Sequence, residues 1–167
     1  SGQGFYKKTI DEKGKKSILE LDLASFEYKK SVKTKFETIA KARKTENLVE
    51  RMKTLFNGKD KAGDFYKKIF AGIFSYSACR IPEIAEEIFR LDEAMKAGFG
   101  WEMGPFEMWD AVGFLNGVKE IKNQGLTIPN WIKELEKNDD FKFYSLENEI
   151  PEFYDLSNNK LIKIPGL

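Results

Sequence analysis

The stretch that decides the fold lies past the middle of the chain and reads Leu91-Asp92-Glu-Ala-Met95-Lys-Ala-Gly98-Phe-Gly100-Trp-Glu-Met-Gly104-Pro105-Phe-Glu-Met-Trp-Asp110-Ala-Val-Gly113. Before Gly98, apolar residues recur at helical spacing, and Pro105 suits the first turn of another helix. The glycines between them allow the backbone to turn with positive φ. The stretch therefore predicts two helices joined by a glycine-rich loop.

Helical patterns continue on the N-terminal side of this loop. Thr34 and Glu37 have the spacing of a capping box for a weak first helix. Thr45 is expected to cap a second helix and Asp60 a third. The third helix carries a wide apolar face over residues 65–77, so it is expected to be the most buried.

On the C-terminal side, Pro82 suits the first turn of a helix that ends at Gly98. Further helices are expected from Pro105 to Gly113, over residues 114–124 and from Pro129 onward. Together these patterns predict a mainly α fold, a bundle of about five or six helices.

Alternating apolar residues predict short β-hairpins at both ends of the bundle. The head strands are expected at residues 18–23 and 27–29, and the tail strands at 141–146, 153–156 and 161–164. The chain thus divides into a closing hairpin (1–30), a basic linker or weak helix (31–45), a helical domain (46–140) and a closing β-hairpin (141–167).

The two ends of the chain resemble each other. Each contains a Phe-Tyr pair (Phe5-Tyr6 and Phe143-Tyr144), an Asp-Leu pair (Asp22-Leu23 and Asp155-Leu156) and a second strand beginning four residues later. A duplicated unit would have this form, and the head would then be the closing hairpin of a preceding copy. The alternative is two ordinary hairpins that share residue types by chance, because turns use few residue types.

Composition excludes several kinds of chemistry. The 167 residues include no histidine and one cysteine. Ser-His-Asp catalysis, Cys-His catalysis and His-bound zinc are therefore excluded within this chain, and no metal site is expected. Cys79 cannot form an internal disulfide and is expected to be a small core residue. No apolar run reaches the roughly 20 residues of a membrane span, so a soluble protein is expected. The single cysteine fits a reducing compartment, and a cytoplasmic location is expected.

The start of the chain and its charge suggest two further expectations. The chain starts at Ser1 without an initiator Met, and no apolar signal segment follows. This start suggests a piece cut from a longer protein. Residues 1–68 carry 18 basic against 10 acidic side chains. Such a half could attract nucleic acid, but arginine is scarce and lysine alternates with acidic residues, so a solvated lysine-coated face is favoured.

The glycine loop nearly spells the dinucleotide-binding pattern G-x-G-x-x-G, but three features argue against it. Met103 occupies the place of the third glycine, the loop follows a helix rather than a strand, and Glu102 would repel a pyrophosphate. A structural role is favoured, in which Phe99 and Trp101 pack against the bundle.

Asp92 and Asp110 stand among apolar neighbours, where carboxyl pKa values shift. They could act as an acid and base pair. We favour roles as caps, or as ion-pair partners of Arg80 or Arg90.

The pattern D-x-A-M-x-x-G-x-G-x-x-x-G-P-F-E-x-x-D-x-x-G, from Asp92 to Gly113, resembles the C-terminal helical domain of the 3-hydroxyacyl-CoA dehydrogenases. It is most similar to the long bacterial type, in which a dinucleotide domain precedes two helical domains. Residues 2–8 resemble the motif that closes the first of them. The resemblance implies a second helical copy with a bundle like the C-terminal domain of 6-phosphogluconate dehydrogenase. Its structural loop motif comprises Asp92, Gly98, Gly100, Gly104, Pro105 and Asp110.

The resemblance implies a β-oxidation enzyme that oxidises the 3-hydroxyl group of an acyl-CoA with NAD. The catalytic His and Glu of the family belong to the dinucleotide domain, and the family's Asn-Arg pair is replaced here by Lys67-Lys68. This copy is thus expected to hold no catalytic or cofactor-binding residue and to be inactive alone.

Its expected roles are to wall the acyl-CoA site, to dock against the first helical domain, or to form a homodimer. Under this hypothesis Lys67 or Lys68 would touch a CoA phosphate, and the apolar residues of 65–74 would face the dinucleotide-binding domain. A helical protein-interaction module unrelated to acyl-CoA is the alternative. No membrane or nucleic-acid partner is expected.

Overall fold

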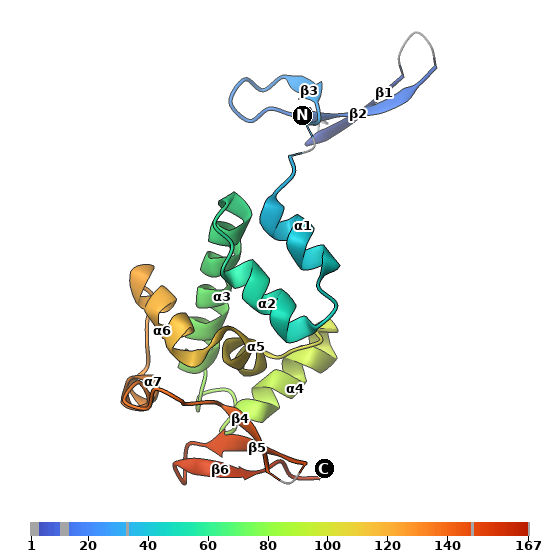
Figure 1. The fold of residues 1–167 in the computed structure, drawn as a ribbon. Coiled ribbons are helices and arrows are strands. Elements are labelled where there is room, and N and C mark those ends of the chain that lie inside the picture. Colours follow the sequence, from blue (N-terminus) through green and yellow to red (C-terminus); the bar gives the residue numbers. More distant parts are fainter. Residues whose placement is uncertain (1–3, 11–13, 33, 148, 167) are drawn as a thin grey trace. The chain divides into compact units, whose positions relative to one another are not determined.

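The computed structural model describes residues 4–10, 14–32, 34–147 and 149–166. The chain forms two compact units, the first ending at Lys35 and the second beginning at Phe36. Seven helices and six strands lie in these described ranges (Figure 1). None of those helices is long and apolar enough to cross a membrane.

The first unit is a three-stranded antiparallel sheet, which we call the head sheet. Its strands are β1 (Tyr6–Ile10), β2 (Lys16–Leu21) and β3 (Tyr28–Lys30), in the order β1-β2-β3. The hairpin expected from the sequence is thus confirmed, and β1 adds a strand to it. Asp22 accepts hydrogen bonds from the backbone N–H groups of Ala24 and Ser25, which forms the turn after β2. Gly2 and Gln3 of the family-like closing motif lie outside the described residues.

The second unit is the predicted mainly α bundle, closed by a second antiparallel sheet. Its helices number seven in the described residues, rather than five or six. They are α1 (Glu37–Lys44), α2 (Leu48–Phe56), α3 (Lys61–Cys79), α4 (Ile88–Phe99), α5 (Pro105–Val112), α6 (Phe114–Asn123) and α7 (Asn130–Leu135). The second sheet, which we call the tail sheet, has β4 (Tyr144–Glu147), β5 (Ile150–Asp155) and β6 (Lys160–Lys163) in sequential order.

Asp60 caps α3 as predicted and also holds α1. Its carboxylate accepts hydrogen bonds from Gly63 N at 3.0 Å and from Thr38 N at 3.1 Å. These two bonds to the ionised form lower the pKa of Asp60 to about 2. One side chain therefore satisfies unpaired N–H groups of two helices.

The predicted caps of the first two helices are wrong. The N-cap position of α1 is Phe36, and its carboxylate cap comes from Asp60 rather than from Thr34. Asn47 caps α2 by accepting from Glu50 N, whereas Thr45 ends α1 and donates to Lys41 O. A threonine serves either end of a helix, because its hydroxyl both donates and accepts.

The helix predicted from Pro82 begins later. Turns occupy residues 80–84, bends follow at 86–87, and α4 starts at the fully buried Ile88. Proline suits a turn as well as a first helical turn, so the sequence signal was ambiguous. The helix also runs past Gly98, ending at Phe99 with Gly100 in the left-handed region at φ 65°.

The core of the second unit is a stack of aromatic rings from α3, α5 and the residues before β4. Trp109 lies against Phe74 with ring centroids 4.9 Å apart, and Phe106 lies at the same distance from Phe143. All four side chains are fully buried. The tail sheet is thus joined to the bundle through its aromatic residues.

Helix α3 is less buried than its wide apolar face suggested. Phe70 and Phe74 belong to the core, but Phe65 and Ile69 are 57% and 44% exposed. One helix can present only part of so wide a face to its neighbours, and here the remainder faces solvent.

Candidate functional site

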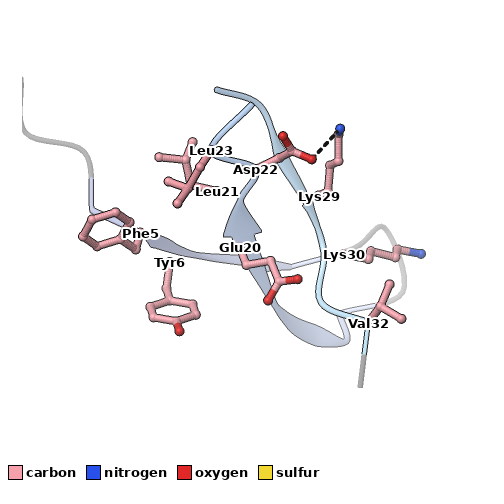
Figure 2. Close-up of a pocket in the computed structure, with 9 residues that line it drawn as sticks. All are labelled: Phe5, Tyr6, Glu20, Leu21, Asp22, Leu23, Lys29, Lys30 and Val32. Carbon is pink, nitrogen blue, oxygen red and sulfur yellow. Dashed lines mark hydrogen bonds and ion pairs between the residues drawn. The ribbon is translucent and has the colours of Figure 1, made fainter. Parts of the chain in front are cut away.

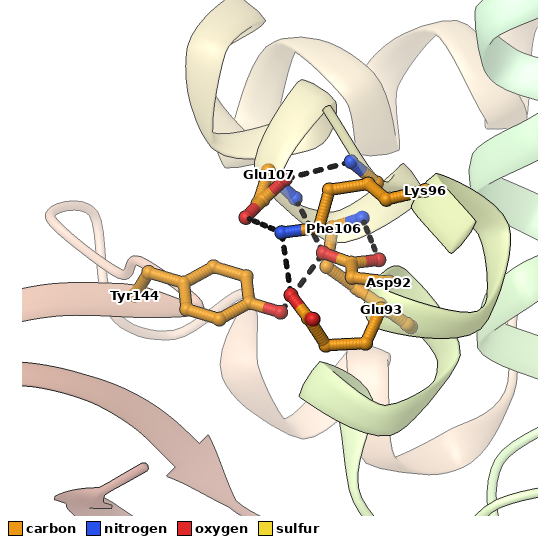
Figure 3. A network of polar contacts seen from close by, with 7 residues as sticks. Asp92, Glu93, Lys96, Phe106, Glu107 and Tyr144 are labelled. Carbon is orange, nitrogen blue, oxygen red and sulfur yellow. Dashed lines mark hydrogen bonds and ion pairs between the residues drawn. The ribbon is translucent and has the colours of Figure 1, made fainter. Parts of the chain in front are cut away.

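The candidate site lies where α4, α5 and β4 meet, and Asp92 is at its centre. Its side chain is 1% exposed. The carboxylate accepts hydrogen bonds from Phe106 N and Glu107 N, both at 3.0 Å, and from the Tyr144 hydroxyl at 2.8 Å (Figure 3). The first N–H groups of a helix lack partners within the helix. Asp92 of α4 therefore caps α5 and ties it to the tail sheet.

The glycine loop makes this capping possible. A Cβ on Gly104 would lie 2.3 Å from Cβ of Asp92, so only glycine fits there. Gly104 N donates to the Glu107 carboxylate at 2.7 Å, and Pro105 starts the helix without needing a partner for an N–H. A Cβ added to Gly98 would meet nothing within 4 Å, so close packing does not require glycine there.

Asp110 holds the start of β4. Its two carboxylate oxygens accept from Phe143 N and Tyr144 N, both at 2.9 Å. Strand β4 is an edge strand, with β5 on one side. The carboxylate occupies the hydrogen-bonding positions that another strand would otherwise take.

Three charged side chains surround this pair of aspartates. Lys96 Nζ lies 2.9 Å from the Glu107 carboxylate and 2.6 Å from that of Glu93 (Figure 3). Burial lowers the pKa of Lys96, but the hydrogen bonds to the two glutamates outweigh it and the pKa is raised. Arg80 and Arg90, the ion-pair partners expected for the aspartates, pair instead with Glu83 and Glu87.

Burial shifts the titration of all three central groups. It raises the pKa of Asp92 and that of Asp110 to about 7, against the opposing effect of their hydrogen-bond donors. Burial also raises the pKa of the Tyr144 hydroxyl, and the adjacent Asp92 raises it further. Such values could serve proton transfer. However, backbone N–H groups and Tyr144 already engage both carboxylates, which is the geometry of caps.

The sequence did not single out Tyr144, Lys96 or Glu107 as site residues. Glu107 follows Gly104 by three residues, a capping spacing that could have revealed it. Tyr144 lies 52 residues from Asp92, so no local pattern links them. Its place in the Phe-Tyr repeat was the available signal.

The start of α5 does not fit the pyrophosphate of NAD. Its N–H groups are taken by Asp92 and Glu107, and both bring negative charge. The loop also follows a helix, as the sequence indicated. Within the described residues, no group of three His, Cys, Asp or Glu side chains is placed to hold a metal ion.

The other predicted residues lie on different elements. Lys67 of α3 donates to Gly58 O at 3.0 Å and lies 3.7 Å from the Asp64 carboxylate. Lys68 is exposed. In the loop, Trp101 packs against the core as expected, but Phe99 is 71% exposed and the expectation for it is wrong.

An apolar groove of about 440 Å³ lies between the end of α3 and α4. Arg80 and Arg90 are among its lining residues. Its apolar lining includes Ile73, Tyr76, Ile84, Leu91, Met95 and Trp101.

Residues 65–139 match the model of a family described as 3-hydroxyacyl-CoA dehydrogenase, C-terminal domain. A probable 3-hydroxyacyl-CoA dehydrogenase of Bacillus subtilis is 37% identical over 98% of this chain and 20% of its own length. A putative fatty acid oxidation complex trifunctional enzyme of Rickettsia felis is 28% identical over 70% of this chain and 18% of its own length. The chain thus spans about a fifth of the relatives that it matches. No solved structure matches it significantly.

Proposed function

Because residues 65–139 belong to the family of 3-hydroxyacyl-CoA dehydrogenase C-terminal domains, we propose that this chain is a non-catalytic helical domain of an NAD-dependent enzyme of that class. The enzyme converts a 3-hydroxyacyl-CoA to the 3-oxoacyl-CoA in cytoplasmic fatty-acid β-oxidation. The second unit is a second helical copy, and the head sheet closes a preceding one. NAD and the proton acceptor belong to a dinucleotide-binding domain outside this chain.

The observation that carries this proposal is the set of hydrogen bonds made by the aspartates of the family motif. Its two aspartates accept hydrogen bonds from backbone N–H groups that define the start of α5 and of β4. The motif glycine at position 104 provides the space for Asp92. These motif residues hold α4, α5 and β4 together, which supports a structural role. The chain also has no histidine that could act as a base.

The outer face of α3 supports docking against another domain. Phe65, Ile69 and Tyr76 follow one another at spacings of four and seven residues and are 57%, 44% and 65% exposed. Of the apolar residues expected to face another domain (Phe65, Ile69, Phe70, Ile73 and Phe74), Phe70 and Phe74 are already part of the core. We therefore assign docking or dimerisation to the exposed members of this face.

The apolar groove favours a second role, as a wall of the acyl-CoA site. An apolar lining with two arginines matches a ligand that has a hydrocarbon chain and anionic phosphates. Ile84, which lies in the groove and is 68% exposed, allows a test with little risk to folding. Ile84→Asp in the intact enzyme should raise KM for long-chain substrates about tenfold and leave short-chain substrates unchanged. Ile10→Asp, at an equally exposed position in the head sheet, is the control.

The direct test measures NADH formation from a 3-hydroxyacyl-CoA by the intact protein and by this chain alone. The proposal predicts turnover by the intact protein and none by the chain. Turnover by the chain alone would contradict the non-catalytic assignment. An inactive intact protein would contradict the enzyme class and favour the alternative, an interaction module.

A further inference from the structure

The head and tail sheets share hydrogen-bond register as well as residue types. Leu21 N donates to Phe5 O at 2.8 Å, and in the tail Tyr154 N donates to Phe143 O at 2.7 Å. Tyr6 lies opposite Glu20, just as Tyr144 lies opposite Phe153. After the shared Asp-Leu turns, Leu21 pairs with Tyr28 and Tyr154 with Leu161. The Phe-Tyr pair therefore occupies the same structural position in both sheets.

The two pairs differ in what covers them. Phe143 is fully buried, and Asp110 accepts from the N–H groups of Phe143 and Tyr144. Phe5 and Tyr6 are 67% and 73% exposed. Figure 2 shows Phe5 beside Leu21 and Leu23, in a surface hollow of about 460 Å³.

Among the described strands, β1 is an edge strand with β2 on one side and no strand on the other. Because Leu21 N bonds to Phe5 O, the next residue, Tyr6, directs its N–H away from β2. In the tail the corresponding N–H of Tyr144 bonds to Asp110, and the Tyr144 hydroxyl bonds to Asp92. The Tyr6 hydroxyl has no hydrogen-bond partner in the part of the chain that the structure describes.

One difference specifies the covering surface further. In the tail, Phe153 packs on Phe89 of α4 with ring centroids 4.6 Å apart. Glu20 stands at the position of Phe153, and its neighbour Lys29 stands at that of Ile162. A bundle that covers the head sheet must therefore present a polar side chain here, where α4 presents a ring.

We propose that Phe5 and Tyr6 form a docking site for another helical bundle of this kind, that of the preceding copy. This bundle presents two aspartates as Asp92 and Asp110 do. One carboxylate accepts from the N–H groups of Phe5 and Tyr6, and the other from the Tyr6 hydroxyl. A polar residue of that bundle faces Glu20. This inference rests on the proposed function, since it takes the intact enzyme to hold two helical copies, and it names the atoms that join them.

The test compares amide hydrogen exchange in this chain alone and in the intact protein. In the intact protein the Tyr6 amide should exchange at least tenfold more slowly than in the chain alone. Tyr6→Phe should accelerate exchange of the neighbouring head-sheet amides about tenfold in the intact protein and leave them unchanged in the chain alone. Equal exchange of the Tyr6 amide in both contexts would overturn the inference.

Tyr28→Phe is the matched control. The Tyr28 hydroxyl donates to Gly4 O within the head sheet, so its loss should have the same effect in both contexts. Dehydrogenase activity is measured on the same intact samples. An active protein with an unprotected Tyr6 amide contradicts this inference alone, whereas an inactive protein contradicts the proposed function.

Discussion

The head and tail sheets have matching strands, matching registers and the same Phe-Tyr pair, yet only one of them is part of a core. Phe143 is fully buried, whereas Phe5 is 67% exposed. The difference does not arise within the sheets. It arises because α4 and α5 bring two carboxylates and a layer of aromatic rings to the tail sheet. Strand pairing is thus a local property here, and burial depends on the helical partner.

The largest predicted contrast between the two sheets is in their response to pH. The pKa values of Asp92 and Asp110 in the folded protein, about 7, lie above their ordinary value of 3.8. A raised pKa gives stability that is present below pH ~4 and is lost progressively as pH rises through ~7. The second unit should therefore become less stable by several kcal/mol over this range, as measured by urea midpoints.

The head sheet should respond in the opposite direction. Hydrogen bonds from Lys29 and from the turn amides hold the pKa of Asp22 well below its usual range. The stabilisation from Asp22 is then present above pH ~4 and lost on further acidification. In the second unit, Asp110→Asn should flatten the fall between pH 4 and 7, and an unchanged slope would count against burial of the carboxylate as its cause.

Truncating the phenylalanine of each Phe-Tyr pair should give the next largest difference between the two sheets, in the free energy of unfolding. Phe143→Ala removes a fully buried ring from the aromatic core and should lower the free energy of unfolding by about 4 kcal/mol. Phe5→Ala, at the matched exposed position, should change it by less than ~0.5 kcal/mol in this chain. Comparable losses at both positions, measured by denaturant titration, would show that the two pairs are equally buried.

A substitution in the glycine loop that packs against Asp92 should have a smaller effect on stability. Gly104→Ala puts a methyl group within 2.5 Å of Asp92 atoms and should cost about 3 kcal/mol. Gly98→Ala, in open space on α4, is the control and should stabilise the chain by about 0.5 kcal/mol. Thermal denaturation of both variants measures the difference, and a neutral Gly104→Ala would contradict the tight packing.

Removing the tyrosine hydroxyl of each Phe-Tyr pair should give the smallest difference in stability between the two sheets. Tyr144→Phe removes the bond to Asp92 and should cost about 1.5 kcal/mol. Tyr6→Phe should have no measurable effect in this chain alone, because the hydroxyl is at an exposed position. Denaturant midpoints of the two variants, measured side by side, test this, and a cost at Tyr6 equal to that at Tyr144 would show that the head tyrosine already has a partner.

The sequence predicted those parts of the fold that short-range interactions determine. The Asp60 cap and the start at Pro105 are confirmed, because each depends on residues within one helical turn. The Phe-Tyr repeat also predicted similar hairpins at the two ends, and the two sheets have matching registers.

Features that depend on distant contacts could not be predicted in the same way. Thr34 has a correct capping pattern, yet α1 takes its cap from Asp60, which lies 22 residues away from Thr38. Asp92 and Asp110 were recognised as unusual carboxylates, but Tyr144 contacts both of them, and only the folded chain brings it there. Tertiary packing decided both cases.

Amide hydrogen exchange of Tyr6 and Tyr144 in a single sample of this chain would show which part of the molecule secures the Phe-Tyr pair. We expect the Tyr144 amide, bonded to Asp110 in the core unit, to be protected at least ~1,000-fold. The Tyr6 amide, on the open edge of β1, should be protected less than ~10-fold. Equal protection of the two amides would contradict the claim that the helical bundle, rather than the sheet itself, holds the pair in place.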